Sequence, residues 1–216
     1  MAQETDNAQS RKLRGLIAEY LGAALVLGAL ILVFSLSAEN FFTYTTFRTS
    51  ANQMPAAMII AVGMTFVLII AGIDLSVGSV LALSGAALGV CMVRFHLPLP
   101  AAIAACLGVG LLCGILNGLV TVRWTLPSFI VTLGMMEIAR GAAYLITDSR
   151  TNYIGRSIAG IAKTSVFGLS LPFLLAVAIV VTGQLLLART SFGRRMVAIG
   201  ANEEAARLSG INTRRV

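Results

Sequence analysis

The stretch GMTFVLIIAGIDLSVGS, residues 63–79, places one acidic residue, Asp74, inside an otherwise apolar run that continues to Val93. A carboxylate with membrane-like sequence on both sides is energetically costly, and such residues are functional candidates by default. Gly72 and Gly78 lie on either side of it and allow the backbone to leave the helical conformation. Non-helical backbone at membrane depth is tolerated only where protein or a watery cavity surrounds it. The stretch therefore predicts two membrane segments joined by a polar, glycine-hinged element on a pathway.

The composition predicts an all-α polytopic membrane protein surrounded by lipid. Hydrophobic residues make up 57% of the chain, charged residues 12%, and the mean hydropathy is +0.89. A soluble domain has too little interior to bury so much apolar surface. The net charge of +7 lies mostly towards the two ends of the chain, which indicates membrane topology and not nucleic-acid binding. The three cysteines and one histidine lack metal-ligand spacing, so we expect no metal site.

Six apolar segments are predicted to cross the bilayer: residues 16–37, 54–71, 75–93, 99–122, 126–147 and 169–188. They divide the chain into an N-terminal tail (1–15), a membrane domain (16–188) and a cytoplasmic loop (189–216). The first ten residues are polar and are expected to be disordered. A signal peptide would have an apolar core of only roughly 7–15 residues, so the first span is expected to be retained. Residues 39–53 are rich in aromatic side chains, which favours a position at the membrane interface.

The distribution of basic residues predicts a cytoplasmic N-terminus under the positive-inside rule. Ten would then lie inside and five outside. The inner set is Arg11, Lys12, Arg14, Arg123, Arg189, Arg194, Arg195, Arg207, Arg214 and Arg215, and the outer set is Arg48, Arg94, Arg150, Arg156 and Lys163.

Small residues recur every fourth position in the fourth predicted span, at Cys106, Gly110, Gly114 and Gly118. Such a stripe lets membrane helices approach closely. We interpret it as a packing surface and not as a substrate site.

Polar residues within the predicted spans are candidates for the pathway. Glu137 and Arg140 are three residues apart, so they share a helix face and are expected to pair, either as a structural ion pair or as a polar lining. Asn117 and Ser128 lie near the inner ends of two spans, and Pro127 disfavours helix at the residue before it. The candidate set is Asp74, Ser76, Asn117, Ser128, Glu137 and Arg140.

Asp74 also has a purely structural interpretation. Its carboxylate is expected to cap a helix by accepting hydrogen bonds from the amides of Ser76 and Val77. The two roles are compatible, because a cap that fixes the hinge also shapes the cavity beside it.

The C-terminal segment predicts a short, well-capped helix over residues 202–210. Asn202 suits the N-cap, Glu203 and Glu204 complement the positive helix start, and Gly210 suits the C′ position. Ala205, Ala206 and Arg207 complete the helix. About two turns are too few for independent stability, so a partner is expected to supply the packing. The alternative is an ordinary amphipathic loop helix.

Three stretches resemble the membrane subunits of ABC importers for simple sugars, the ribose/xylose/arabinose-type permeases. They are residues 63–79, Asn117-Gly118 with PSFIVTLGM at 127–135, and GANEEAARLSGI at 200–211. The resemblance implies a permease of about ten helices, of which about six are present, with roughly four more spans of about 20 residues each beyond Val216. It also implies that residues 202–210 form the coupling helix that docks into a cytoplasmic ATPase.

The resemblance further implies a second permease copy, an extracytoplasmic sugar-binding protein and a bacterial inner membrane. ATP and Mg²⁺ would be used by the ATPase, and this chain would hold no cofactor. Consistent with that, the sequence has no P-loop, HExxH or GxSxG motif and no plausible catalytic triad. Three alternatives stay open: a permease for nucleosides or branched-chain amino acids, an ion-coupled secondary transporter using Asp74, and an intramembrane enzyme using Asp74 or Glu137.

Overall fold

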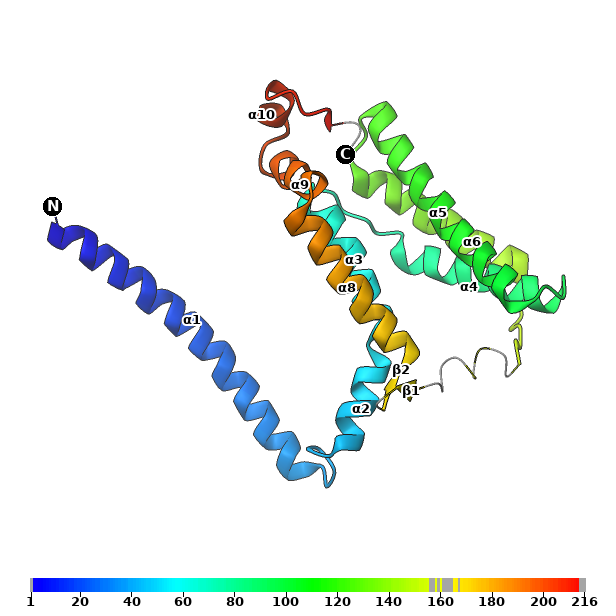
Figure 1. Ribbon diagram of the computed structural model, residues 1–216, viewed down its shortest axis with the longest axis horizontal. Helices are drawn as coiled ribbons and strands as arrows, with labels where there is room; N and C mark the ends of the chain where they lie inside the picture. Colours follow the sequence, from blue (N-terminus) through cyan, green and yellow to red (C-terminus); the bar gives the residue numbers. More distant parts are fainter. Residues whose placement is uncertain (1, 156–157, 159, 161–164, 167, 214–216) are drawn as a thin grey trace. The chain divides into compact units, whose positions relative to one another are not determined.

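The computed structural model describes residues 2–155, 158, 160, 165–166 and 168–213, with side chains from residue 20 onward except 165–166. Within this part of the chain the fold is helical, apart from one antiparallel pair of two-residue strands (Figure 1). The elements are α1 (Ala2–Ser37), α2 (Tyr44–Gln53), α3 (Pro55–Ile69), α4 (Val77–Val93), α5 (Leu99–Trp124), α6 (Ser128–Thr147), β1 (Ser165–Val166), β2 (Leu169–Ser170), α8 (Leu171–Arg189), α9 (Ser191–Ala201) and α10 (Glu203–Leu208).

The chain divides into two compact units, Met1–Ser50 and Ala51–Val216. In the first unit α1 begins at Ala2, and the expected disorder of the first ten residues stays a prediction. Good helix formers such as Ala, Gln, Glu, Lys and Arg prolong the helix once the apolar segment has nucleated it. After α1, Phe41 stacks on Phe34 and meets Phe42 edge-on, with ring centroids 6.2 and 5.1 Å apart.

Each of the six predicted spans contains a helix, but they are not equally long. Among the described residues, four helices are long and apolar enough alone to cross a membrane: Tyr20–Ser37 within α1, and α5, α6 and α8. Counting α2 and α3 as one bent span gives a fifth. Helix α4 has 17 residues, or about 26 Å at 1.5 Å per residue, which is short of the roughly 30 Å hydrocarbon core. Residues 72–76, which are not helical, lengthen this segment.

The second unit contains two groups of packed helices (Figure 1). In the α3 group, α3 lies beside α8, and α9 and α10 follow from the end of α8. In the α5 group, α4 packs against both α5 and α6. Gly183 of α8 permits close contact between α8 and α3, because a Cβ atom there would lie 2.9 Å from Val62 Cγ1. Residues 70–76 connect the two groups.

Contacts between distant segments agree with the predicted alternation of spans. Arg94, after α4, forms an ion pair with Asp148, after α6, and the Ser170 amide donates to Asn52 Oδ1 at 2.8 Å. The first contact joins two segments predicted to lie outside, and the second joins such a segment to the outer end of the sixth predicted span. Of the basic residues used for the topology, Arg156, Lys163, Arg214 and Arg215 lie outside the described residues, as do the side chains of Arg11, Lys12 and Arg14.

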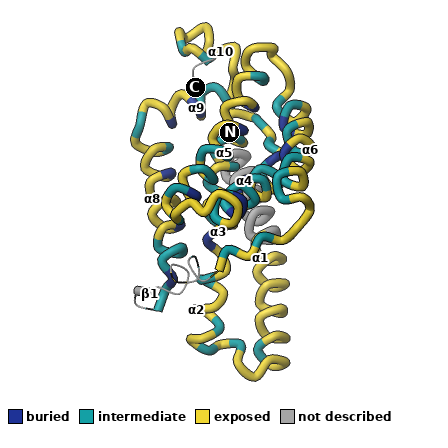
Figure 2. Tube along the Cα trace, turned by 90° about the vertical axis from the view of Figure 1, so that its right-hand side faces the viewer, coloured by how far each residue is buried: buried dark blue, intermediate teal, exposed yellow. Residues whose placement is uncertain are grey.

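Few residues are buried, and exposed positions dominate the trace (Figure 2). Large apolar side chains such as Leu107, Leu111 and Leu119 on α5 are more than half exposed. Small side chains, including Ala102, Ala139 and Ala176, fill the interior instead. This pattern is typical of membrane helices, whose apolar outer surface faces lipid and whose close contacts use small residues.

We predict that Gly183→Leu destabilises the protein by about 1–3 kcal/mol, the usual effect of overpacking. The new side chain would collide with Val62 and Phe66. The measurement is the unfolding temperature of the purified protein in detergent. Gly108→Leu in α5 is the matched control, since a Cβ there meets nothing within 4 Å. Equal unfolding temperatures for the two variants would contradict the tight α3–α8 contact.

Candidate functional site

The apolar stretch breaks just before Asp74, as the sequence predicts. The amides of Ala71 and Gly72 donate to the carbonyls of Leu68 and Val67, both at 2.9 Å, which forms a Schellman end to α3. Its left-handed residue is Ala71, with φ +59°. The predicted roles of the two glycines therefore need correction. Gly72 follows the left-handed residue, and Gly78 lies within the first turn of α4.

Two hydroxyl side chains of α6 hold the non-helical backbone that follows. The Ile73 amide donates to Ser128 Oγ at 2.9 Å, and the Leu75 amide donates to Thr132 Oγ1 at 3.1 Å. Thr132 Oγ1 also lies 3.2 Å from the Ile73 carbonyl oxygen, to which it donates. The turn before Ser128 forms as predicted, because α6 begins at that residue, directly after Pro127. These bonds satisfy backbone groups that would otherwise be unpaired inside the fold.

Asp74 accepts two hydrogen bonds at one carboxylate oxygen. The Ser76 amide donates to Asp74 Oδ1 at 2.8 Å, and the Ser76 hydroxyl donates to the same oxygen at 2.6 Å. This is an Asx turn. The predicted bond from the Ser76 amide is confirmed, whereas the one from Val77 is wrong, because Ser76 itself precedes α4 and Asp74 reaches only two residues ahead.

Asn117 of α5 joins this network from a neighbouring helix. Its Nδ2 donates to Ser76 Oγ at 3.1 Å, and Ser76 is only 1% exposed. Because the Ser76 proton is directed to Asp74, Ser76 Oγ can only accept from Asn117, which fixes the orientation of the amide. Asn117 Oδ1 is buried and has no hydrogen-bond partner among the described residues. Asn117 lies seven residues before the end of α5, or about 10 Å along the helix.

A cavity of about 530 Å³ lies beside this network. Its lining includes Asp74, Ser76 and Asn117, apolar side chains of α4 and α5, and Ile60 of α3. Four of the six predicted pathway residues, Asp74, Ser76, Asn117 and Ser128, thus gather around residues 73–76. The cavity is mostly apolar, with a few polar groups in its lining, an arrangement suited to a small, partly polar solute.

The small-residue stripe of α5 lies partly along this cavity. At Gly110 a Cβ would lie 3.4 Å from Ser84 Oγ of α4, but at Gly114 and Gly118 nothing lies within 4 Å. Cys106, Gly110 and Gly114 line the cavity. Of the three glycines in the stripe, only Gly110 therefore lies close enough to α4 for an added Cβ to meet it. That Gly114 and Gly118 pack against another helix stays a prediction.

Glu137 and Arg140 lie apart from the Asp74 network. Their side chains pair within α6 at 3.4 Å and are about half exposed. Arg140 lines a different cavity, of about 440 Å³, together with Gly78, Ser79 and Tyr144. The pair forms as the spacing predicts, but it is internal to one helix and does not bridge to a neighbour.

The C-terminal helix α10 is capped at its start as predicted. Asn202 Oδ1 accepts the amide of Ala205 at 2.9 Å, and Glu203 and Glu204 occupy the first turn. Asn202 also ends α9, so no linker separates the two helices.

The end of α10 is a Schellman motif. The amides of Gly210 and Ile211 donate to the carbonyls of Arg207 and Ala206 at 3.0 and 3.1 Å, and Gly210 has the left-handed φ of +82°. Ala206 is 4% exposed and Leu208 is 79% exposed. Ala206 therefore faces the chain's own interior, and the outer face presents Leu208 beside the Glu204–Arg207 ion pair.

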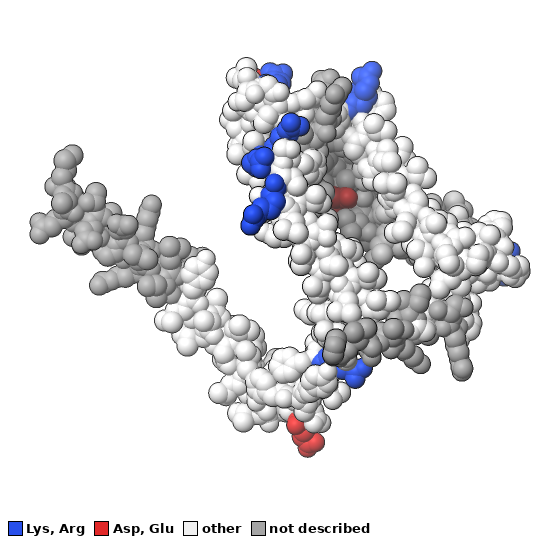
Figure 3. Space-filling view, viewed as in Figure 1, with Lys and Arg blue, Asp and Glu red and all other residues white. Residues whose placement is uncertain are grey.

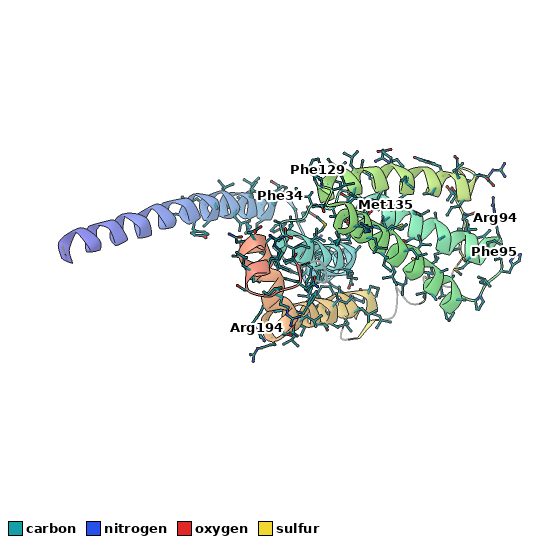
Figure 4. All side chains as sticks on the ribbon, turned by 90° about the horizontal axis from the view of Figure 1, so that it is seen from above. Phe34, Arg94, Phe95, Phe129, Met135 and Arg194 are labelled. Carbon is teal, nitrogen blue, oxygen red and sulfur yellow. The ribbon has the colours of Figure 1, made fainter. Side chains whose placement is uncertain are left out.

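The α10 end of the second unit is also its basic end. Lys and Arg side chains gather over α9 and α10 (Figure 3), and Arg194 points away from the packed helices (Figure 4). A cleft of about 490 Å³ separates α10 from the α5–α6 turn and is lined by Glu203, Arg207 and Thr125. Two segments predicted to be cytoplasmic thus lie at one end.

Sequence comparison places the chain among transport proteins. Residues 46–216 match the family described as branched-chain amino acid transport system / permease component. The chain belongs to this permease family. The comparison with solved structures gave no match.

Curated relatives of the permease share about a third of its residues. The ribose import permease protein RbsC of Haemophilus influenzae is 37% identical, over 100% of this chain and 67% of that protein. The L-arabinose transport system permease protein AraH of Escherichia coli is 36% identical, over 91% and 60%. The fructose import permease protein FrcC of Rhizobium meliloti is 33% identical, over 82% and 52%. The chain therefore spans between about half and two thirds of the length of these relatives.

Two structural features beside the candidate site were not predicted from the sequence. Thr132 lies four residues after Ser128, on the same face of α6, and this spacing of two hydroxyl residues was the available signal. Helix α9 follows Thr190, whose hydroxyl caps it by accepting the Gly193 amide at 3.2 Å. No group of three or more metal-ligating side chains occurs among the described residues.

We predict that Ser76→Ala destabilises the permease by about 1–3 kcal/mol, because it leaves the buried Asn117 amide unpaired. It also removes one of the two bonds to Asp74. Thermal unfolding in detergent measures the effect. Ser79→Ala, one turn further along α4, is the control, since the Ser79 hydroxyl has no hydrogen-bond partner among the described residues. Identical unfolding temperatures would show that the network contributes nothing to stability.

Proposed function

We propose that this chain is the membrane-spanning permease subunit of an ATP-driven ABC importer for a monosaccharide. The observation that carries the proposal is α10, a six-residue helix capped at both ends. Helices this short are marginal in water, and only one side chain of α10 is buried in the chain itself. Such a helix is suited to docking in a groove of another protein.

The partner of α10 in this proposal is a cytoplasmic ATPase subunit, which uses ATP and Mg²⁺. The permease holds no cofactor and has no catalytic site of its own. An extracytoplasmic sugar-binding protein delivers the substrate, a second permease copy completes the pathway, and lipid surrounds the apolar helices. The chain lies in a bacterial inner membrane with its N-terminus and α10 in the cytoplasm, and the basic residues over α9 and α10 agree with the cytoplasmic position of α10.

A pentose-like sugar such as ribose, xylose or arabinose is the proposed substrate class. The relatives named for ribose, arabinose and fructose support a sugar. The second candidate is a branched-chain amino acid or nucleoside, because the family description names branched-chain amino acid transport. Uptake of labelled pentoses and of labelled leucine by the assembled transporter distinguishes the two. An ion-coupled transporter or an intramembrane enzyme has less support, because neither has a use for α10.

The proposed pathway passes the cavity beside Asp74. Its lining offers a carboxylate and a buried amide next to apolar side chains, and sugars present both hydroxyl groups and apolar faces. The Glu137–Arg140 pair is proposed as a second polar patch at another level of α6.

We predict that Leu208→Asp lowers co-purification of the ATPase with the assembled permease by roughly tenfold, a loss of about 1.4 kcal/mol. A charge in place of an exposed apolar side chain disfavours burial in a groove. Leu208→Met, which keeps the apolar volume, should bind as the wild type does. If Leu208→Asp retains the ATPase and sugar-stimulated hydrolysis, α10 is an ordinary loop helix and the docking assignment is wrong.

We also predict that Asp74→Asn lowers sugar uptake by roughly tenfold, or about 1.4 kcal/mol, while abundance in the membrane is unchanged. Asparagine can still accept both hydrogen bonds from Ser76 but carries no charge. The control Asp148→Asn removes the acid of the exposed ion pair with Arg94 and should leave uptake as it is. If Asp74→Asn takes up sugar as the wild type does, the charge of the Asp74 carboxylate has no part in the mechanism.

A further inference from the structure

Helix α9 touches the end of α3 at a distance that only glycine permits. A Cβ atom built on Gly200 would lie 1.7 Å from the carbonyl oxygen of Ile69 and 2.8 Å from its carbon. Because both partners at this contact are backbone, no side-chain movement could relieve the collision. Gly193, near the start of α9, has the same relation to α8, with its Cβ position 2.1 Å from the Leu187 carbonyl oxygen. Helix α9 is therefore seated on α8 and α3 by backbone contacts at both of its ends.

The Gly200 contact lies where α3 gives way to the 70–76 segment. Ile69 is the last residue of α3, and the left-handed Ala71 follows two residues later. The far end of the segment is fixed to the α5 group, through Ser128 and Thr132 of α6 and Asn117 of α5. One end of the 70–76 segment is thus held by α9 and the other by α5 and α6.

Helix α10 begins almost directly after the contact between Gly200 and Ile69. Asn202 ends α9 and begins α10, so only Ala201 separates the Gly200 contact from the cap of α10. The α3 group faces the α5 group across two openings. One is the Asp74 cavity, which includes Ile60 of α3, and the other is the cleft beside α10. A movement of α10 as a rigid extension of α9 would alter both openings.

We infer that Gly200 is a coupling residue: a displacement of α10 is transmitted through its backbone contact with Ile69 to the 70–76 segment, which contains Asp74. The displacement passes along α9 to Ile69 and is taken up at Ala71 and Gly72, because the segment beyond them is hydrogen-bonded to α5 and α6. Gly200 acts by positioning backbone and touches no solute. This inference rests on the proposed docking of α10 to an ATPase and adds the route by which that docking acts.

The test uses the assembled transporter and measures the ratio of sugar-stimulated to basal ATP hydrolysis. Gly200→Ala should lower this ratio by at least about fivefold, the lower end of typical coupling between sites, while the ATPase still co-purifies. Gly134→Ala is the matched control, because it adds the same methyl group to a helix where nothing lies within 4 Å. Its ratio should equal that of the wild type.

A second variant covers the case in which Gly200→Ala does not accumulate. Insertion of two glycines between Ala201 and Asn202 leaves the Gly200 contact and the caps of α10 in place but makes their connection flexible. It should retain the ATPase and lower the same ratio to a similar extent. If this variant, or a Gly200→Ala protein that accumulates, couples as the wild type does, the inference is overturned. If the wild-type permease binds no ATPase, the proposed function itself fails.

Discussion

The structure depends on the hydrogen bonds that satisfy the backbone of residues 70–76. These residues leave the helix inside an apolar fold, where an unpaired amide or carbonyl group is costly. The side chains of Ser128 and Thr132 accept hydrogen bonds from the amides of Ile73 and Leu75, and Asp74 accepts one from the amide of Ser76. The position of α6 beside this segment follows from that requirement, as does the start of α4 at Val77.

Much of this arrangement could be predicted from local sequence. The apolar segments, the turn before Ser128 and both caps of α10 depend on residues close together in the chain, so composition and spacing were sufficient. The bond from the Ser76 amide to Asp74 also spans only two residues. Thr132 and Asn117 acquire their partners through packing between helices, and the sequence holds no record of which helices meet. Gly200 and Gly114 look alike in sequence, yet one touches backbone and the other faces a cavity.

Ala71 illustrates why local rules fail at such a site. A glycine next to a predicted break is expected to be its left-handed residue, but the chain places alanine there and glycine one position later. Alanine in this conformation costs roughly 1–2 kcal/mol. Gly72 instead accommodates close backbone, since a Cβ there would lie 3.1 Å from the Val67 carbonyl oxygen. The close backbone contact at position 72 therefore favours glycine there, and the alanine at position 71 adopts the left-handed conformation in spite of its cost.

The buried carbonyl oxygen of Asn117 has a consequence for what can bind in the cavity that Asn117 lines. A buried acceptor that gains a donor recovers about 1–3 kcal/mol. Every 1.4 kcal/mol corresponds to a factor of about ten in an equilibrium. A bound solute that supplied a donor to this oxygen would therefore be held roughly fivefold to 150-fold more tightly than one that left the oxygen without it.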